Sequence, residues 1–280
     1  MRLFFRIIFV LVFAVPLYAD PIRVVRREVK IDGWLKEHHG LKIAFFADTH
    51  LLESNIKEEP FSALPALLAK EKPDLILLGG DTVDTPARMR ELEGFFVNWV
   101  AAFPATPCGI YAVLGNHDLN RKKQVLAMLK KAKINVLCDS GTEIMFNGKP
   151  FRLLGSMEEN NEKAYIHPPF LELVKKSTPC IVVTHRPVSF RFLPSDQPML
   201  ILAGHTHGGV VHVPGLPRGT VMRLFTKDHD TEFVYGWFEK DKKKMFITGG
   251  MGGNGKSSMR FGNPPELVIV TMMYEPAEEK

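Results

Sequence analysis

The sequence has 280 residues, 45% of them hydrophobic, and it carries 36 basic and 31 acidic side chains. This composition excludes a disordered chain and supplies enough apolar surface for one large α/β domain. The formal net charge of +5 comes from charges of mixed sign, which argues against a nucleic-acid-binding protein. The three cysteines lack metal-like spacing, and we expect buried free thiols rather than a disulfide framework.

The first 19 residues have the layout of a signal or membrane-anchor segment. Arg2 and Arg6 precede an uncharged apolar run from Ile7 to Tyr18. The cleavage site is poor because Leu17 stands where a small residue is usual, so cleavage, anchoring and a buried N-terminal helix all stay open. Residues 20–40 are predicted to form a basic lead-in beside the membrane. Basic residues on both flanks leave the orientation open.

From residue 41 onward, apolar runs of strand character alternate with helical patterns. Unbroken apolar runs are typical of strands that are covered on both faces. Five such runs end in Asp, Asn or His: 42–50, 74–81, 109–118, 179–185 and 198–207. Helices are expected within 59–72, 85–103 and 121–132, and short hairpin or edge strands at 143–147, 151–156, 210–213, 232–240, 243–250 and 266–274. The pattern predicts one α/β domain over 41–274, a layered sandwich of two mixed β-sheets flanked by helices, with a tail at 275–280.

The polar residues that end the five runs form a candidate metal site. Ligands gather at the carboxyl ends of strands in open α/β sheets. The residues concerned are Asp48, His50, Asp81, Asp84, Asn116, His117, Asp118, His185, His205 and His207. Carboxylates, an amide oxygen and imidazoles together suit manganese, iron or zinc better than calcium.

Each cluster also has a purely structural interpretation. Asp81 and Asp84 could cap a helix, and the Gly-Asn-His-Asp stretch at 115–118 could be a plain turn. His185 could be a core histidine, and the 205–207 pair could lie in a solvated loop. Taken together, however, five such clusters after five strands favour a metal site.

The ordered motifs resemble those of the calcineurin-like metallophosphoesterases. They are Asp48-x-His50, Gly80-Asp81-x-x-Asp84, Gly115-Asn116-His117-Asp118, Thr184-His185 and Gly204-His205-x-His207. The Gly-His-Thr-His-Gly-Gly stretch and the segment at 260–270 are similar to a bacterial membrane-associated or exported branch. That branch includes a lipid A pathway hydrolase of UDP-2,3-diacylglucosamine. The segment after His50 departs from the pattern because it lacks a glycine found in many relatives.

The resemblance implies two divalent metal ions, with manganese expected and iron or zinc as alternatives, bridged by Asp81. Asp48, His50 and His207 would complete one site, and Asn116, His185 and His205 the other. Paired cations of this kind hold a phosphate and lower the pKa of a bound water so that it attacks as hydroxide. His117 would stabilise charge or protonate the leaving oxygen. Asp118 or Asp84 would orient an imidazole.

The implied substrate is a phosphodiester or diphosphate, with UDP-2,3-diacylglucosamine as the best candidate. A lipid-linked nucleotide and a membrane surface are the expected partners, and nucleic acid is not. Arg260 is a candidate contact to the substrate phosphate, with pairing to Glu266 as the alternative. A UDP-lipid requires a site at the cytoplasmic face, whereas a general phosphodiesterase could be exported. A non-catalytic scaffold with this fold is the third alternative. Nothing in the sequence indicates the oligomeric state.

Overall fold

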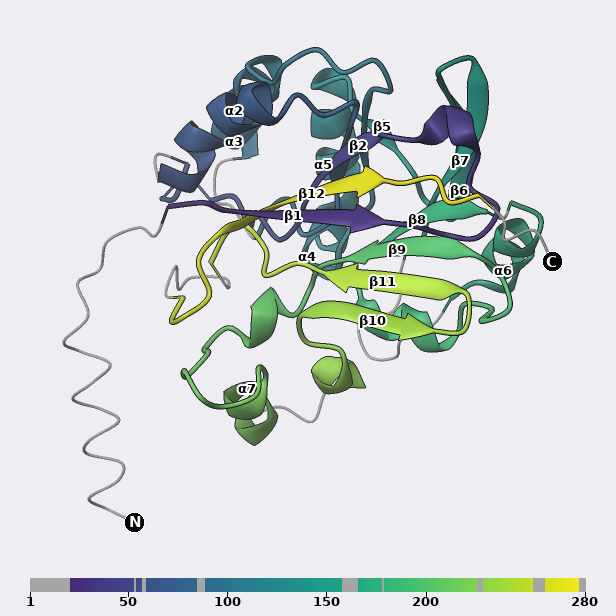
Figure 1. Cartoon of the computed structure of the whole chain (residues 1–280). Coiled ribbons are helices and arrows are strands. Elements are labelled where there is room, and N and C mark those ends of the chain that lie inside the picture. The colour runs from purple at the N-terminus through teal and green to yellow at the C-terminus, as the bar shows by residue number, and fades with distance from the viewer. Residues whose placement is uncertain are drawn as a thin grey trace.

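The computed structural model describes residues 21–52, 54–56, 59–84, 89–157, 166–177, 179–225, 229–253 and 260–276. Two six-stranded sheets pack against each other, and helices lie on their outer sides (Figure 1). This confirms the predicted sandwich of two mixed sheets flanked by helices. The predicted segment 1–19 and most of the predicted tail lie outside the described residues. None of the helices in the described ranges has the length and apolar character needed to cross a membrane.

The first sheet contains the strands that precede three of the predicted clusters. Its order is β1 (Arg23–Val29), β12 (Glu266–Met272), β2 (Lys42–Phe46), β3 (Leu75–Leu78), β4 (Ile110–Ala112) and β5 (Asn135–Val136). Strands β2 to β5 are parallel, so their carboxyl ends lie along one edge. Strand β12 runs parallel to β1 and antiparallel to β2.

Part of the predicted basic lead-in is therefore a strand of the folded domain. Arg23–Val29 pairs along its whole length with β12. Arg23 forms an ion pair with buried Glu266, and Arg26 forms one with Glu71. The arginines that suggested a segment beside the membrane thus have carboxylate partners within the fold. Strand β12, which was expected at an edge or in a hairpin, lies inside the sheet because β1 covers its other side.

The second sheet contains the strands that precede the remaining two clusters. Its order is β10 (Gly236–Lys240), β11 (Lys243–Ile247), β9 (Met199–Ala203), β8 (Cys180–Thr184), β7 (Lys149–Gly155) and β6 (Ser140–Phe146). Strands β7, β8, β9 and β11 are parallel, and β6 and β10 are antiparallel edges. The strand expected at 210–213 is reduced to an isolated bridge between Val211 and Phe261.

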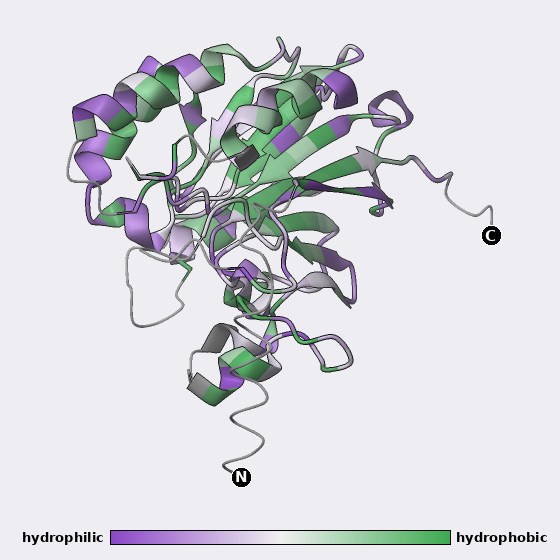
Figure 2. Cartoon of the chain, turned by 90° about the vertical axis from the view of Figure 1, so that its left-hand side faces the viewer, coloured by the Kyte–Doolittle hydropathy of each residue, from purple (hydrophilic) through white to green (hydrophobic). Residues whose placement is uncertain are grey.

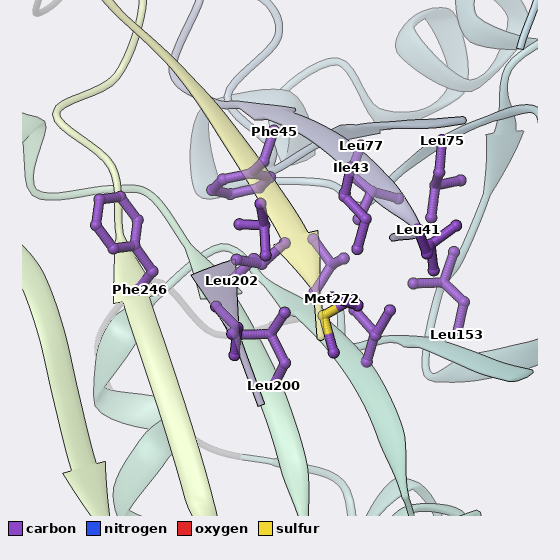
Figure 3. Packing of buried hydrophobic residues seen from close by; sticks show 14 of the residues in the cluster. Leu41, Ile43, Phe45, Leu75, Leu77, Leu153, Leu200, Leu202, Phe246 and Met272 are labelled. Carbon is purple, nitrogen blue, oxygen red and sulfur yellow. The ribbon is translucent and has the colours of Figure 1, made fainter. Parts of the chain in front are cut away.

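The main core lies between the two sheets. Figure 3 shows Ile43, Phe45 and Leu77 of the first sheet above Leu200 and Leu202 of the second. All five side chains are fully buried. Strands buried on both faces need apolar residues at every position rather than at alternate positions, which explains the unbroken runs in the sequence. This packing fixes the two sheets, and hence the polar residues that follow their strands, relative to each other.

Helices bury the outer faces of the sheets. The first sheet is covered by α2 (Glu59–Glu71), α3 (Met89–Ala101) and α5 (Lys122–Lys131), which confirms the three expected helices. Residues of α6 (Pro168–Lys175) pack against the second sheet. The helices over the first sheet carry both hydrophilic and hydrophobic residues (Figure 2), and the buried residues of α3 and α5 are all apolar. Short elements complete the fold: α4 (Asn116–Leu119), α7 (Thr220–Phe225) and the 3-10 helices η1 (Lys36–His38), η2 (Pro187–Arg191), η3 (His207–Gly209) and η4 (His229–Glu232).

Candidate metal centre

The predicted ligands come together where the carboxyl ends of five strands meet. Strands β2, β3 and β4 of the first sheet and β8 and β9 of the second all end at this point. The residues that follow them include the seven predicted ligands: Asp48, His50, Asp81, Asn116, His185, His205 and His207. The carboxylates and imidazoles fall into overlapping groups whose potential ligand atoms lie within 4.8 Å of one another.

The backbone at this edge is sharply turned. Asp48, His50, Asp81, His205 and His207 all have positive φ angles, between 42° and 74°. Residues with a β-carbon adopt this left-handed region rarely and at a cost of order 1–3 kcal/mol each. The surrounding structure holds them there: the backbone N–H of Asp48 donates to the carbonyl of Gly80, and that of His50 to the carbonyl of Asp81. These turns aim the side chains away from the strands and into one space.

One group consists of Asp48, His50 and His207. The Nε2 atoms of His50 and His207 lie 3.1 Å apart, and Nε2 of His207 lies 3.9 Å from Oδ1 of Asp48. All three side chains are buried. The His205 N–H donates to both carboxylate oxygens of Asp48 at 3.0 Å, which fixes the orientation of that carboxylate.

A second group consists of Asp81, His185 and His205, with Asn116 beside it. Nε2 of His185 lies 3.2 Å from Oδ2 of Asp81, 3.2 Å from Nδ1 of His205 and 3.1 Å from Oδ1 of Asn116. Nδ1 of His185 contacts the carbonyl oxygen of Gly79 at 2.9 Å, so this nitrogen is the donor and Nε2 faces the group.

Asp81 is shared between the two groups. Its Oδ2 lies 3.2 Å from Nε2 of His185 and 3.5 Å from Nε2 of His50. Its Oδ1 accepts a hydrogen bond of 2.8 Å from the backbone N–H of His117. This placement is the one that a bridging carboxylate requires.

Burial and charge shift the pKa values of these groups. Burial lowers the pKa of His50 to about 4 and that of His207 well below its usual value, so both imidazoles are neutral at pH 7. Burial also raises the pKa of Asp48 to about 6. Burial would lower the pKa of His185, but the negative charge and hydrogen bond of Asp81, the charge of Asp48 and the contact with the Gly79 carbonyl together outweigh it and raise that pKa to about 10. In turn, His185 holds the pKa of Asp81 below its usual range although burial opposes it.

The donor chemistry of the two groups fits divalent metal ions. The Nε2 atoms of His50 and His207 face each other at 3.1 Å, so at most one of these two neutral rings carries its proton on Nε2, and the other directs a lone pair into the site. Neutral imidazoles, carboxylates and an amide oxygen are the ligands that manganese, iron and zinc take in proteins, and His185, whose pKa is raised, would release its proton when an ion binds. The residues present therefore fit divalent metal ions of this kind, and Asp81 would be within reach of both groups.

His117 lies beside the two groups without belonging to the buried set. Its ring is 4.6 Å from that of His50, and about a third of its side chain is exposed. Its Nδ1 lies 2.9 Å from Oδ1 of Asp84, so Asp84 is the carboxylate that orients this ring. With Nδ1 engaged, Nε2 is the nitrogen left for a substrate. A pocket opens over the site, lined by His50, Asp81, His117, His205, Thr206, His207, Val210 and Met222.

Asp118 occupies a different position from its neighbour His117. Its carboxylate is fully buried and accepts hydrogen bonds from the backbone N–H groups of Gly115 and Val83. Burial raises its pKa to about 7. Asp118 thus holds the start of α4 against the loop after β3, and of the two carboxylates expected to orient an imidazole, the one in contact with His117 is Asp84.

Arg260 binds backbone carbonyls. Its guanidinium donates to those of Gly249, Gly250 and Gly252, and its Nε donates to that of Asn263. Glu266 accepts from Arg23 and from the hydroxyl of Tyr235. The contacts of Arg260 hold the glycine-rich stretch 249–252 against the first strand end, and a contact to substrate phosphate stays a proposal.

Sequence reasoning missed two supports of the site. One is the stretch 249–252, where the Gly252 N–H donates to the carbonyl of Asp48 and a β-carbon on Gly252 would lie 2.0 Å from the carbonyl oxygen of Thr49. The other is Asn55, whose side chain donates to the carbonyl of His50 and accepts from the N–H of Leu52. Asn55 closes the loop that lacks the expected glycine. The glycine repeat at 249–253 was the available signal for the first support; a single asparagine gave none for the second.

The family model for calcineurin-like phosphoesterases matches residues 41–209. This range runs from the start of β2 to the end of η3 and contains all seven predicted ligands.

Curated relatives match most of the chain. An uncharacterized metallophosphoesterase of Aquifex aeolicus is 31% identical over 83% of this chain and 85% of its own length. The phosphodiesterase YaeI of Escherichia coli is 29% identical over 83% of this chain and 82% of its own. The UDP-2,3-diacylglucosamine pyrophosphatase LpxG of Chlamydia trachomatis is 22% identical over 91% of this chain and 90% of its own.

Proposed function

Because this chain belongs to the calcineurin-like phosphoesterase family, we propose that it is a binuclear metal-dependent hydrolase of UDP-2,3-diacylglucosamine, releasing UMP and 2,3-diacylglucosamine 1-phosphate. Metal-dependent phosphoester hydrolysis is supported above all by one observation: the two groups of potential ligands share Asp81. Two divalent ions bound there would supply the Lewis acidity that polarises a phosphoryl group and lowers the pKa of a bound water. We propose manganese as the native metal, with iron or zinc as alternatives.

Each residue of the site has a proposed role. Asp48, His50 and His207 would hold one ion, Asn116, His185 and His205 would hold the other, and Asp81 would serve both. His117 faces the pocket with Nε2 and places its proton or positive charge at a phosphoryl oxygen or at the leaving oxygen. Asp84 keeps the ring in that orientation. Arg260 is proposed as a contact to the distal phosphate.

Two observations support a lipid-linked substrate. The chain aligns with the chlamydial LpxG proteins over nine tenths of both lengths. Val210 and Met222 also place apolar side chains in the wall of the pocket. On this proposal, segment 1–19 attaches the protein to a membrane and the site lies at the cytoplasmic face, where UDP-lipids are available.

A general phosphodiesterase, which could be exported, is the second candidate. The higher identity to YaeI, which is named a phosphodiesterase, favours it. A non-catalytic scaffold is disfavoured because the structure brings all seven predicted ligands and His117 together.

The test uses the full chain with its metal content measured first. Incubated with manganese, it should release UMP from UDP-2,3-diacylglucosamine faster than it cleaves a generic aryl phosphodiester. The reverse order would establish the general phosphodiesterase. His117→Ala should keep its metal and lose activity by about a hundredfold. His39→Ala, a histidine at the opposite end of the first sheet, should change neither quantity. Equal activity of both variants would remove His117 from the mechanism.

A further inference from the structure

Exposed apolar side chains are concentrated on one segment of the described chain. Val213, Leu216 and Leu224 have exposed fractions of 38%, 46% and 75%, and all three lie within twelve residues. We call these three residues the apolar rim. Single exposed leucines are normal on soluble proteins, but a group of them on one projecting segment marks a contact surface.

The apolar rim adjoins the metal centre. It follows directly on His205, His207 and η3, and the helix α7 that contains Leu224 also contains Met222, which lines the metal pocket. Val210, at the start of the same segment, lines that pocket too. The segment therefore presents apolar side chains to the pocket and, a few residues away, to solvent.

The N-terminal end of the folded domain lies at the same edge. Arg23 pairs with Glu266 at the start of β12, beyond the pair formed by Val268 and Phe45, so β1 begins level with the carboxyl end of β2. Figure 1 shows the start of β1 on the same side of the molecule as α7, and that side faces the viewer in Figure 2.

Tyr235 contacts both the start of β1 and the segment that bears the apolar rim. The ring of Tyr235 lies 4.2 Å from the guanidinium of Arg218, within the apolar segment, and 5.4 Å from that of Arg23. The hydroxyl of Tyr235 also accepts a 2.8 Å hydrogen bond from Arg23. The described chain therefore begins beside the segment that bears the apolar rim.

The residues before position 21 include the uncharged apolar run from Ile7 to Tyr18. A lipid bilayer is the partner that matches an apolar run and an apolar rim at one edge, and Arg218 and Arg223 add positive charge to the segment that bears the rim, which favours anionic head groups. We propose that the apolar rim rests on the surface of an anionic bilayer, so that the metal centre opens toward the membrane. The contact itself is independent of the reaction, and only its benefit to a lipid-linked substrate rests on the proposed function.

The first experiment measures which edge meets the bilayer. Full-length Leu224→Trp and Met145→Trp variants are mixed with phosphatidylglycerol–phosphatidylethanolamine vesicles that carry brominated acyl chains. Met145 is 60% exposed but lies near the turn of the β6–β7 hairpin, at the end of the second sheet away from the metal centre. We expect the bromine to quench the added emission of Leu224→Trp and to leave that of Met145→Trp unchanged.

Equal or weaker quenching of Leu224→Trp would overturn the proposal. So would an emission change that needs no lipid and grows with protein concentration, because that result would assign the apolar rim to contact between two copies of the chain. Neither result depends on hydrolysis, so an inactive preparation tests the bilayer contact equally well.

The second experiment measures the consequence for turnover. In Leu216→Asp/Leu224→Asp, hydrolysis of a phosphodiester embedded in vesicles should fall by about tenfold, since both apolar contacts with lipid are replaced by charges. Hydrolysis of a soluble aryl phosphodiester should be unchanged in this variant and in the control Met145→Asp. Equal loss on both substrates would show damage to the fold and contradict the proposal. Absence of hydrolysis in the unaltered protein would count against the proposed function alone.

Discussion

A substitution at Gly115 tests how tightly the carboxylate of Asp81 is positioned. A β-carbon on Gly115 would lie 2.2 Å from Oδ1 and 2.4 Å from the backbone nitrogen of Asp81. The φ angle of Gly115 is −99°, which alanine adopts freely, so the conflict is one of space alone. Restoring an ordinary contact of 3.4 Å moves the carboxylate by about 1.2 Å. Because Asp81 belongs to both ligand groups, Gly115→Ala disturbs both proposed ions at once.

A misplacement of about 1 Å at a reacting centre costs on the order of 100-fold in rate, and crowding of a packed site costs about 1–3 kcal/mol of stability. We therefore expect Gly115→Ala to hydrolyse an aryl phosphodiester about a hundredfold more slowly and to bind less metal per chain. The assays are steady-state kinetics, metal analysis and thermal unfolding.

The matched control is Gly94→Ala. Gly94 is exposed on α3, and a β-carbon there meets no atom within 4 Å. Alanine in the interior of a helix should raise stability by about 0.5–1 kcal/mol without affecting hydrolysis. Full metal content and wild-type activity in Gly115→Ala would refute the inference that this glycine sets the position of Asp81.

Three further predictions concern charge. Asp84→Asn should lower kcat about tenfold at unchanged metal content, because His117 loses a charge-assisted hydrogen bond, and kinetics with metal analysis checks this. Burial lowers the pKa of Lys243 to about 8, against 10.5 in the unfolded chain. Between pH 8 and pH 10.5 the unfolded chain therefore holds a proton on Lys243 that the folded protein has released. Stability of the unaltered protein relative to Lys243→Met should therefore rise from pH 8 to pH 10.5 in denaturant titrations, and a constant difference would contradict it. Glu266→Gln should lower the free energy of unfolding by about 2 kcal/mol, because it breaks an ion pair with a fully buried carboxylate and a partly exposed arginine. Glu71→Gln, whose arginine partner is exposed, should cost less, and equal losses would refute the role of burial.

The strand ends that hold the site were predictable because buried parallel strands leave an unambiguous pattern. The runs ending at Asp48, Asp81 and His185 have no charged residue within the strand core, and a polar residue follows each of them closely. The outer helices were predictable for a similar reason, since their apolar residues recur with helical spacing.

The first and last strands were harder to place because their partners are distant in sequence. The arginines of 23–29 read as a surface segment, and only the fold brings Glu266 and Glu71 to them. Pairing between residues more than 240 positions apart leaves no local signal. The same holds for Asn55, because an asparagine that closes a loop is indistinguishable in sequence from one in solvent.

The position of β12 between β1 and β2 has a consequence for how the protein is made. During synthesis, β1 and β2 emerge from the ribosome long before residues 266–272, which must fit between them. Until then the two strands have no mutual hydrogen bonds to form, and the Arg23 side chain has not met its carboxylate. The first sheet is therefore completed only after residues 266–272 have been synthesised, and truncations or fusions that disturb 266–272 should yield chains in which β1 is detached from the rest of the domain.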